Sequence, residues 1–247
     1  MGFEDAFLTG LIFLAAALYS SVGHAGASGY LAAMALFGLA PEEMRPSALA
    51  LNILVASFGT WRYWRAGFHD FRLLVPFAVA SVPAAFLGGL IAVPGGVYRP
   101  LVGIVLALSA VQFFRTARKA PKEDLKTRPP RPTIALGAGG GIGFLAGLTG
   151  TGGGIFLSPL LLLLHWTDTR RASGIVSAFI LVNSAAGLAG TAFSIGALPP
   201  ALPLWAAAAL GGAVLGTRLG TRTLLVPCLR TMLSLVLAVA SLKMVFF

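Results

Sequence analysis

Three long apolar stretches constrain the fold of this chain more than any other feature. They are Leu73 to Val93, Leu101 to Phe114 and Leu224 to Leu242, and they reach or approach the ~20 residues that a helix needs to span a bilayer. Backbone polar groups find no water in hydrocarbon, so these stretches must be helical or buried. The chain is 57% hydrophobic and only 11% charged, which lies outside the range of soluble domains. The sequence therefore predicts an all-α integral membrane protein that has the lipid bilayer as a partner.

Several classes of function are excluded by the sequence. The net charge is +10, but the basic residues form no patch with interleaved aromatics, so we expect no nucleic-acid partner. A single cysteine, Cys228, allows neither an intramolecular disulfide nor a cysteine-built metal cluster. No Gly-Lys-Ser or Gly-Lys-Thr ends a glycine run, so the chain has no phosphate-binding loop for ATP. We expect no cofactor, no metal ion and no enzymatic activity.

A basic, proline-containing segment divides the chain into two apolar halves. We assign residues 1–117 to a first membrane repeat, residues 118–132 to an exposed basic linker and residues 133–247 to a second membrane repeat. Together the two repeats form one transmembrane domain.

The two halves resemble each other in order and spacing. Ile53-Leu54-Val55-Ala56-Ser57 matches Ile180-Leu181-Val182-Asn183-Ser184 at an offset of 127 residues. Glycines match at the same offset, Gly23 with Gly150 and Gly26 with Gly153. These matches indicate an internal repeat of one helical unit.

Each half is predicted to contain a helix, a glycine turn, a shorter helix and three longer helices. In the first half these are Phe7 to Val22, Gly29 to Leu39, Arg45 to Trp64, Phe71 to Val93 and Val97 to Ala117. In the second half they are Thr133 to Leu148, Ile155 to His165, Ala172 to Phe193, Leu202 to Thr221 and Val226 to Val245. Glu4 and Asp5 stand where a secretory signal would carry positive charge, so we expect the first helix to be retained.

The distribution of Lys and Arg selects between two topologies. The segments around each glycine turn form either a hairpin or one broken crossing of the membrane. Hairpins place 15 of the 18 Lys and Arg residues on the linker side, whereas broken crossings in the second half leave only 11 there. Hairpins also give each half an odd number of passages, so the two repeats are predicted to be inverted relative to each other, with the linker in the cytoplasm.

The two glycine turns are candidate binding elements. They are Gly23-His24-Ala25-Gly26-Ala27-Ser28-Gly29 and Thr149-Gly150-Thr151-Gly152-Gly153-Gly154, and each precedes a helix of only ~11 residues, too short to cross a bilayer alone. We therefore place the turns inside the membrane, where the next helix offers free N–H groups and a positive dipole end. A small anion is the natural ligand for such an end. The alternative is that these glycines only permit close helix packing.

Polar side chains complete the candidate site. Asn52 and Asn183 lie in the third helix of each half, one helical turn apart on the same face in the repeat alignment. An amide in a bilayer needs a partner, which is either a neighbouring helix or a ligand. The candidate substrate-binding residues are Gly23, His24, Gly26, Ser28, Asn52, Ser57, Gly150, Thr151, Gly152, Gly153, Gly154, Asn183 and Ser184.

Other features indicate a structural role. Ridges of small residues are expected at helix-packing seams, and they are Gly139, Gly143 and Gly147, then Gly212, Gly216 and Gly220, then Ala80, Ala84 and Gly88. Arg45 and Arg171 flank the entrances of equivalent helices on opposite sides. We expect both arginines to extend their charged ends toward water rather than to bind a ligand.

The chain resembles the sulfite exporter TauE/SafE family. The resemblance rests on the glycine turn with its short helix, the Pro41-to-Ser57 stretch, the charged linker, and Leu145-Ala-Gly-Leu-Thr-Gly-Thr-Gly-Gly-Gly-Ile with Ser158-Pro159. It covers nearly the whole chain and implies a multi-pass permease of the bacterial inner membrane. The cargo that it implies is sulfite or an organosulfonate. Independently of the resemblance, inverted repeats around one central site predict alternating access, and we expect the two glycine turns to meet near the bilayer midplane.

Two other functions remain open from the sequence. A passive anion channel would use the same site without alternating access. An intramembrane serine protease is suggested by Gly26-Ala27-Ser28-Gly29 at a helix start, with Ser28 as the nucleophile.

Overall fold

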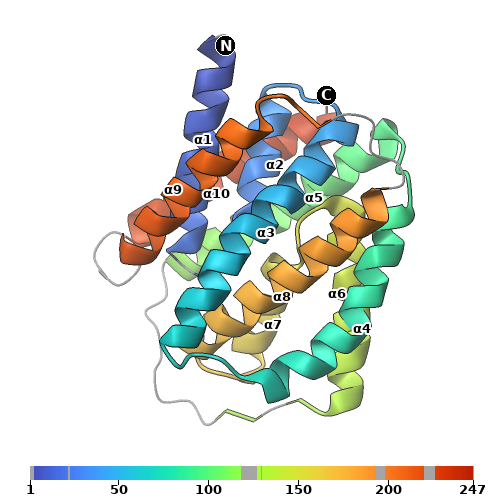
Figure 1. Ribbon diagram of the computed structural model, residues 1–247, viewed down its shortest axis with the longest axis vertical. Helices are drawn as coiled ribbons and strands as arrows, with labels where there is room; N and C mark the ends of the chain where they lie inside the picture. The colour runs from blue at the N-terminus through green and yellow to red at the C-terminus, as the bar shows by residue number, and fades with distance from the viewer. Residues whose placement is uncertain are drawn as a thin grey trace.

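A computed structural model describes residues 3–21, 23–117, 127–128, 130–192, 198–219 and 226–246 of the chain. Within these residues every regular element is an α-helix (Figure 1). The helices of the first half are α1 (Phe3–Ser20), α2 (Ala27–Leu36), α3 (Pro41–Arg65), α4 (Phe71–Leu90) and α5 (Gly95–Ala117). Those of the second half are α6 (Pro132–Thr149), α7 (Gly154–Leu163), α8 (Thr169–Thr191), α9 (Leu202–Leu219) and α10 (Val226–Phe246).

The predicted order of long and short helices is confirmed, and the boundaries differ by a few residues. The largest differences are at the starts of α1 and α3, which begin four residues earlier than predicted. The helix α3 starts at Pro41 because proline suits the first helical turn, and Glu42 and Glu43 then face the positive end of the helix dipole. The predicted ends at Val22, Phe193 and Thr221, and most of the linker, lie outside the described residues.

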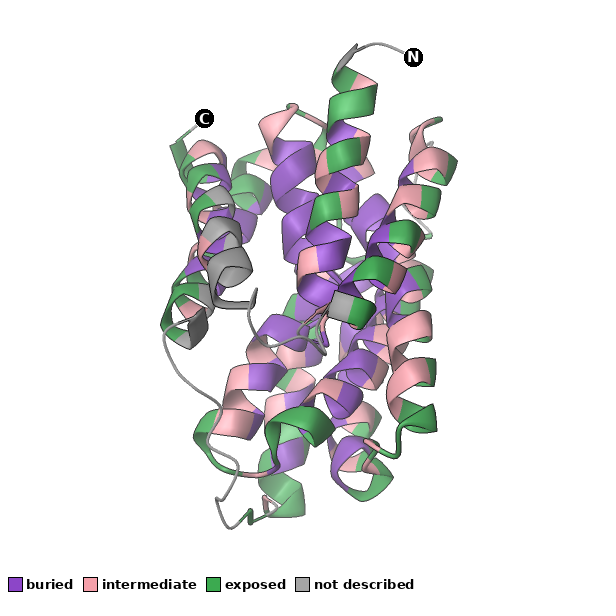
Figure 2. Ribbon diagram, turned by 90° about the vertical axis from the view of Figure 1, so that its left-hand side faces the viewer, coloured by how far each residue is buried: buried purple, intermediate pink, exposed green. Residues whose placement is uncertain are grey.

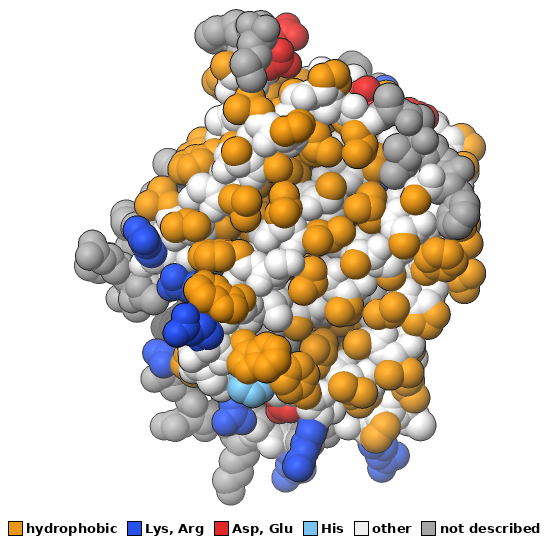
Figure 3. Space-filling view, viewed as in Figure 1, with side chains coloured by type: hydrophobic (Ala, Val, Ile, Leu, Met, Phe, Trp, Pro, Cys, Tyr) orange, Lys and Arg blue, Asp and Glu red, His pale blue; other side chains and the backbone are white. Residues whose placement is uncertain are grey.

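Within the described residues, four helices are long and apolar enough to cross a membrane. They are Phe71–Leu90, Gly95–Gln112, Pro132–Thr149 and Thr169–Thr191, whereas Ala27–Leu36 and Gly154–Leu163 are apolar but short. Hydrophobic side chains cover the middle of the face drawn in Figure 3, and most of the Lys and Arg side chains visible there gather toward one end. This belt is the surface expected of a multi-pass membrane protein. The stretch Leu224 to Leu242 begins outside the described residues.

The molecule has two distinct ends. Both chain termini lie at one end, which we call the terminal end, and α6 begins at the opposite end, which we call the linker end (Figure 1). The short helix α2 lies toward the terminal end and α7 toward the linker end. The two hairpins thus enter the molecule from opposite ends.

Small residues join the two halves. Gly139, Gly143 and Gly147 of α6 lie directly against the backbone of Phe77, Ser81 and Ala85 in α4. Gly212 and Gly216 of α9 lie in the same way against Phe13 and Ala17 in α1. The first helix of each half therefore packs along the fourth helix of the other half. The predicted packing role of these glycines is confirmed, while Gly220 lies outside the described residues.

The buried centre of the molecule is the pair α3 and α8. These helices pack against each other in antiparallel fashion, because Gly59 lies beside Ser177 and Asn52 lies beside Ser184. Figure 2 shows the buried residues concentrated in the middle of the bundle, with exposed residues on its outer faces. The α3–α8 pair therefore forms the frame on which the candidate site is built.

Candidate functional site

The second glycine turn lies inside the protein, as predicted for irregular backbone at membrane depth. Residues 149–155 are all buried. Gly150 ends α6 with a φ of 83° and Gly153 precedes α7 with a φ of 81°, and glycine adopts this left-handed conformation without the steric cost that other residues incur. The hydroxyls of Thr149 and Thr151 bond to each other at 2.9 Å. The turn is therefore held by its own side chains and by the helices around it.

Three of the predicted site residues come together at the centre of the α3–α8 pair. Asn52 Nδ2 lies 3.3 Å from Ser184 Oγ, so the two halves are joined by a polar contact. Gly152 lies against both, because a β-carbon at position 152 would come within 2.7 Å of Asn52 Nδ2 and 2.8 Å of Ser184 Oγ. Only glycine leaves room here for the turn, the amide and the hydroxyl.

Two carboxamide oxygens in this region have no hydrogen-bond partner among the described residues. Asn52 and Asn183 are both 0% exposed, and the Oδ1 atom of each is unpaired. Asn183 Nδ2 donates to Phe179 O at 2.8 Å. If the oxygen and nitrogen of the Asn52 amide were exchanged by a rotation, Asn52 would still bond to Ser184, because a hydroxyl donates as well as accepts. Buried amides with unused capacity are costly to maintain unless something uses them.

The first glycine turn has different neighbours. Gly23 O accepts a hydrogen bond of 2.9 Å from Ser177 Oγ in α8. Gly26 precedes α2 with a φ of 112° and lies under the ring of Tyr30. The hydroxyls of Ser28 and Tyr19 form a hydrogen bond of 2.6 Å. The rings of His24 and Tyr19 are arranged edge to face, with their centroids 6.5 Å apart. In the described part of the chain, no histidine is a hydrogen-bond partner of Ser28.

The tips of the two glycine turns do not meet at one point, which corrects the expected convergence at the midplane. Gly23 lies against Tyr63 near the linker end of α3, whereas Gly150 lies against Arg45 near its terminal end. Tyr63 and Arg45 are separated by about five helical turns, or ~27 Å. The start of each turn nevertheless contacts the third helix of the other half, Gly23 through Ser177 and Gly150 through Arg45. The central level is occupied by Gly152.

Two further expectations are corrected by the structure. Ser57 is exposed and lies outside the central cluster, although Ser184, which it matches in the repeat, is buried. Arg45 does not extend toward water, because it is only 6% exposed. Its guanidinium donates from Nε to Gly147 O at 2.9 Å, from Nη1 to Ile91 O at 2.9 Å and from Nη2 to Gly88 O at 2.6 Å.

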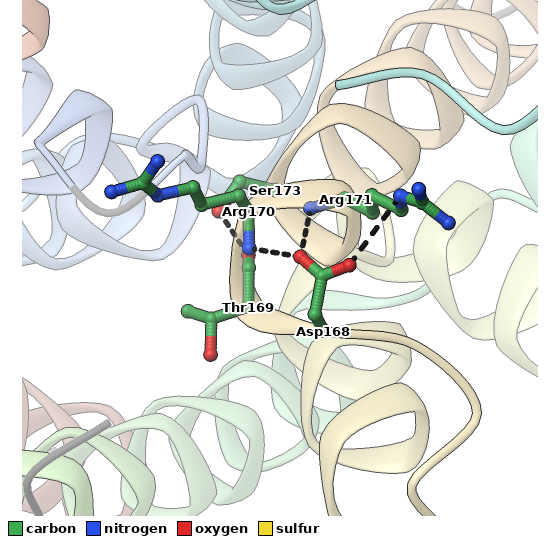
Figure 4. A network of polar contacts seen from close by, with 5 residues as sticks. All are labelled: Asp168, Thr169, Arg170, Arg171 and Ser173. Carbon is green, nitrogen blue, oxygen red and sulfur yellow. Dashed lines mark hydrogen bonds and ion pairs between the residues drawn. The ribbon is translucent and has the colours of Figure 1, made fainter. Parts of the chain in front are cut away.

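The arginine at the other end of the central pair is exposed, as expected. Arg171 lies at the start of α8, where its Nε is 3.5 Å from Asp168 Oδ2 (Figure 4). Asp168 Oδ1 also accepts from the backbone N–H groups of Arg170 and Arg171, at 3.0 and 2.9 Å. The carboxylate therefore caps α8 and pairs with the arginine at the same time.

Buried tyrosines were missed in the sequence. Tyr30 OH donates to Ala25 O at 2.6 Å and Tyr98 OH donates to Thr149 O at 3.0 Å, so each phenol holds a carbonyl next to a glycine turn. A tyrosine within an apolar span is a usable signal, because its hydroxyl needs a partner when buried and turns leave carbonyls free.

The hollows at the two ends of the central pair differ in size. At the terminal end a cleft of about 270 Å³ is lined by Pro41, Glu42, Arg45, Pro46, Ala92, Val93, Pro94, Tyr98 and Thr191. At the linker end a hollow of about 20 Å³ is lined mainly by Thr60, Tyr63, Trp64, His69, Gly174 and Ala178. Among the described residues, no group of three His, Cys, Asp or Glu side chains is placed to hold a metal ion.

Comparison with known proteins agrees with this architecture. The chain is 40% identical to the "Probable membrane transporter protein y4hK" of Sinorhizobium fredii, over 95% of each chain. It is 27% identical to the "Probable membrane transporter protein YjnA" of Bacillus subtilis, over 72% of this chain and 75% of the relative. No solved structure matches the chain. Residues 8–244 match the family described as sulfite exporter TauE/SafE, and the chain belongs to this family of membrane transporters.

Proposed function

We propose that this chain is a secondary transporter of a small sulfur-containing anion such as sulfite or an organosulfonate. The observation that carries the proposal is the buried contact of Asn52 with Ser184 against Gly152. It places an amide and a hydroxyl beside the glycine turn that precedes α7. Hydroxyl, amide and backbone N–H groups are the donors that pyramidal or tetrahedral oxyanions accept.

Alternating access is supported by how the halves interlock. The first helix of each half packs along the fourth helix of the other, and the two hairpins enter from opposite ends. These contacts are those expected of inverted repeats, which move against each other around a shared site. We place the repeats at residues 1–117 and 133–247, with the basic linker at 118–132 in the cytoplasm.

The membrane potential is a sufficient driving force for export. Moving one negative charge out of a cell with a negative interior releases ~2.3 kcal/mol per 100 mV. The helices at the centre supply neutral donors rather than carboxylates, so the substrate crosses with its charge. Export of an anion then needs neither ATP nor a second ion.

Flux measurements in proteoliposomes test this proposal. We expect labelled sulfite or sulfoacetate to cross in vesicles that contain the full chain, and Asn52→Leu to reduce the flux by at least ~30-fold, because it removes a charge-assisted hydrogen bond worth about 2 kcal/mol and leaves Ser184 unpaired. Ser57→Ala is the matched control, since Ser57 is exposed on the same helix. Flux of carboxylates only, or full flux in Asn52→Leu, would contradict the proposal.

Counterflow distinguishes a carrier from a channel. A carrier accelerates uptake of labelled anion when unlabelled anion is present on the opposite side, whereas an open pore does not. We expect acceleration. The protease alternative is not proposed, because the hydroxyl of Ser28 bonds to Tyr19 rather than to a general base.

A further inference from the structure

Arg45 carries a buried positive charge that no described carboxylate neutralises. Its three acceptors are the neutral carbonyls of Gly88, Ile91 and Gly147, at the ends of α4 and α6. Arg171, in contrast, pairs with Asp168 at the opposite end of the molecule. An ionised side chain at membrane depth is costly, and such residues commonly mark the path of an ion.

The guanidinium has donors to spare. It carries five N–H groups, and three of them are used by the carbonyls. One N–H group on Nη1 and one on Nη2 have no acceptor in the described part of the chain. Two parallel N–H groups are the arrangement that binds two oxygens of an oxyanion.

Arg45 lines the cleft at the terminal end. Its volume of about 270 Å³ equals that of roughly nine water molecules at ~30 Å³ each, which is enough for a small oxyanion and a few waters. Tyr98 and Thr191 form part of the wall, and Glu42 stands exposed at the rim. The carboxylate of Glu42 opposes entry of an anion, so it should weaken binding.

The second glycine turn contacts two of the residues that line this cleft. A β-carbon at Gly150 would lie 3.2 Å from Arg45 Cγ, and Tyr98 donates to Thr149 O at 3.0 Å. Arg45 and Asn52 lie seven residues apart on one face of α3, a distance of ~10 Å. The cleft therefore lies about two helical turns from the central cluster of Asn52, Gly152 and Ser184.

We propose that the cleft at Arg45 is a second anion site, an access site that binds the oxyanion before it reaches the central cluster. The guanidinium supplies the charge and two N–H donors, while the helix-end carbonyls hold it in place. The step from this site to the centre rests on the proposed function, but binding at Arg45 does not.

Direct binding measurements test this site without depending on transport. Isothermal titration of the purified full chain in detergent, at low salt and without oxygen, uses sulfite as the probe. We expect Arg45→Gln to weaken binding at least tenfold, Arg45→Lys to weaken it less, and Glu42→Gln to strengthen it two- to threefold. Arg171→Gln is the matched control and should bind within twofold of wild type, because its side chain is exposed and distant.

The outcomes separate this proposal from that of transport. Binding that survives in Asn52→Leu while flux is lost supports two sites, and binding lost in Asn52→Leu assigns the sulfite to the central cluster and overturns the access site. Unchanged affinity for sulfite in folded Arg45→Gln, or no sulfite binding by wild type, also overturns the access site.

If Arg45→Gln does not fold, the Glu42→Gln variant decides. An affinity for sulfite that does not rise in Glu42→Gln excludes an anion at this rim. Binding that depends on Arg45 in a protein without flux would refute the transport proposal alone.

Discussion

The two ends of the central helix pair carry arginines at near-matching positions in the sequence alignment of the two halves, yet the two arginines differ in burial and in their bonding partners. Arg45 at the terminal end is 6% exposed and bonds to carbonyls of both halves, whereas Arg171 at the linker end is exposed and faces Asp168. The hollow beside Arg45 measures about 270 Å³ and the one at the linker end about 20 Å³. The two ends of the central helix pair are thus unequal.

This inequality is what alternating access requires at any one moment. A carrier built from inverted repeats has two related gates, and only one of them is open in a given state. Under the proposed mechanism, the described conformation is open at the terminal end and closed at the linker end. Under that mechanism, the difference between the ends is a property of the state as well as of the sequence.

Removing each arginine gives the largest expected difference between the ends. Arg45→Ala leaves the carbonyls of Gly88, Ile91 and Gly147 without their donors, and we expect it to lower the free energy of unfolding by ~3–5 kcal/mol, as for other broken buried polar networks. Arg171→Ala breaks only an exposed pair, which is worth ~0.2–1 kcal/mol. Thermal unfolding of both variants in detergent measures this, and equal losses would show that the burial of Arg45 has no energetic weight.

Two glycines with similar backbone conformations provide a second comparison of the two ends. Gly150 at the terminal end has a φ of 83°, and Gly67 at the linker end has a φ of 76°. A β-carbon added at Gly150 would lie 3.2 Å from Arg45 Cγ, whereas one added at Gly67 would meet open space. Both Ala variants incur the ~1–2 kcal/mol cost of a left-handed residue, but Gly150→Ala also disturbs Arg45, and this overpacking adds ~1–3 kcal/mol. We expect flux to fall about tenfold in Gly150→Ala and less than threefold in Gly67→Ala. Similar fluxes in the two variants would contradict the contrast.

The accessibility of the two hollows can be compared with engineered cysteines. Val93 lines the cleft and Ala178 lines the smaller hollow, and both are half-buried. In a Cys228→Ala background, a charged thiol reagent should modify Val93→Cys about tenfold faster than Ala178→Cys, which corresponds to ~1.4 kcal/mol. Sulfite should slow the reaction at Val93→Cys only. Faster reaction at Ala178→Cys would mean that the protein in detergent is open at the linker end.

The fold was largely predictable because its signals are local. Apolar length, glycine turns and short helices are read directly along the chain, and the helices of the described residues follow in the expected order. Parts of the candidate site were predictable too, since Asn52, Gly152 and Ser184 stand out as polar or small residues in apolar surroundings and the structure joins them.

The environment of Arg45 was not predictable, because its partners have no signature in the sequence. They are backbone carbonyls at the ends of two other helices, and one of them, at Gly147, is 102 residues away. The position of Ser57 outside the central cluster was unpredictable for a related reason. Ser57 matches Ser184 in the repeat, but the position of a residue in a repeat does not fix which face of its helix is covered.

Substitution of Asp168 at the linker end is expected to have the smallest effect on stability, and it tests whether the start of α8 moves during transport. Its carboxylate accepts from the N–H groups of Arg170 and Arg171 at the start of α8, whereas α3 starts at the terminal end after Ala40 without a side-chain cap. Asp168→Ala should lower the free energy of unfolding by ~1 kcal/mol, the usual cost of a lost N-cap, and leave sulfite affinity within twofold of wild type. A flux that falls tenfold with this small loss of stability would show that the start of α8 moves during transport, because a static cap acts on stability alone.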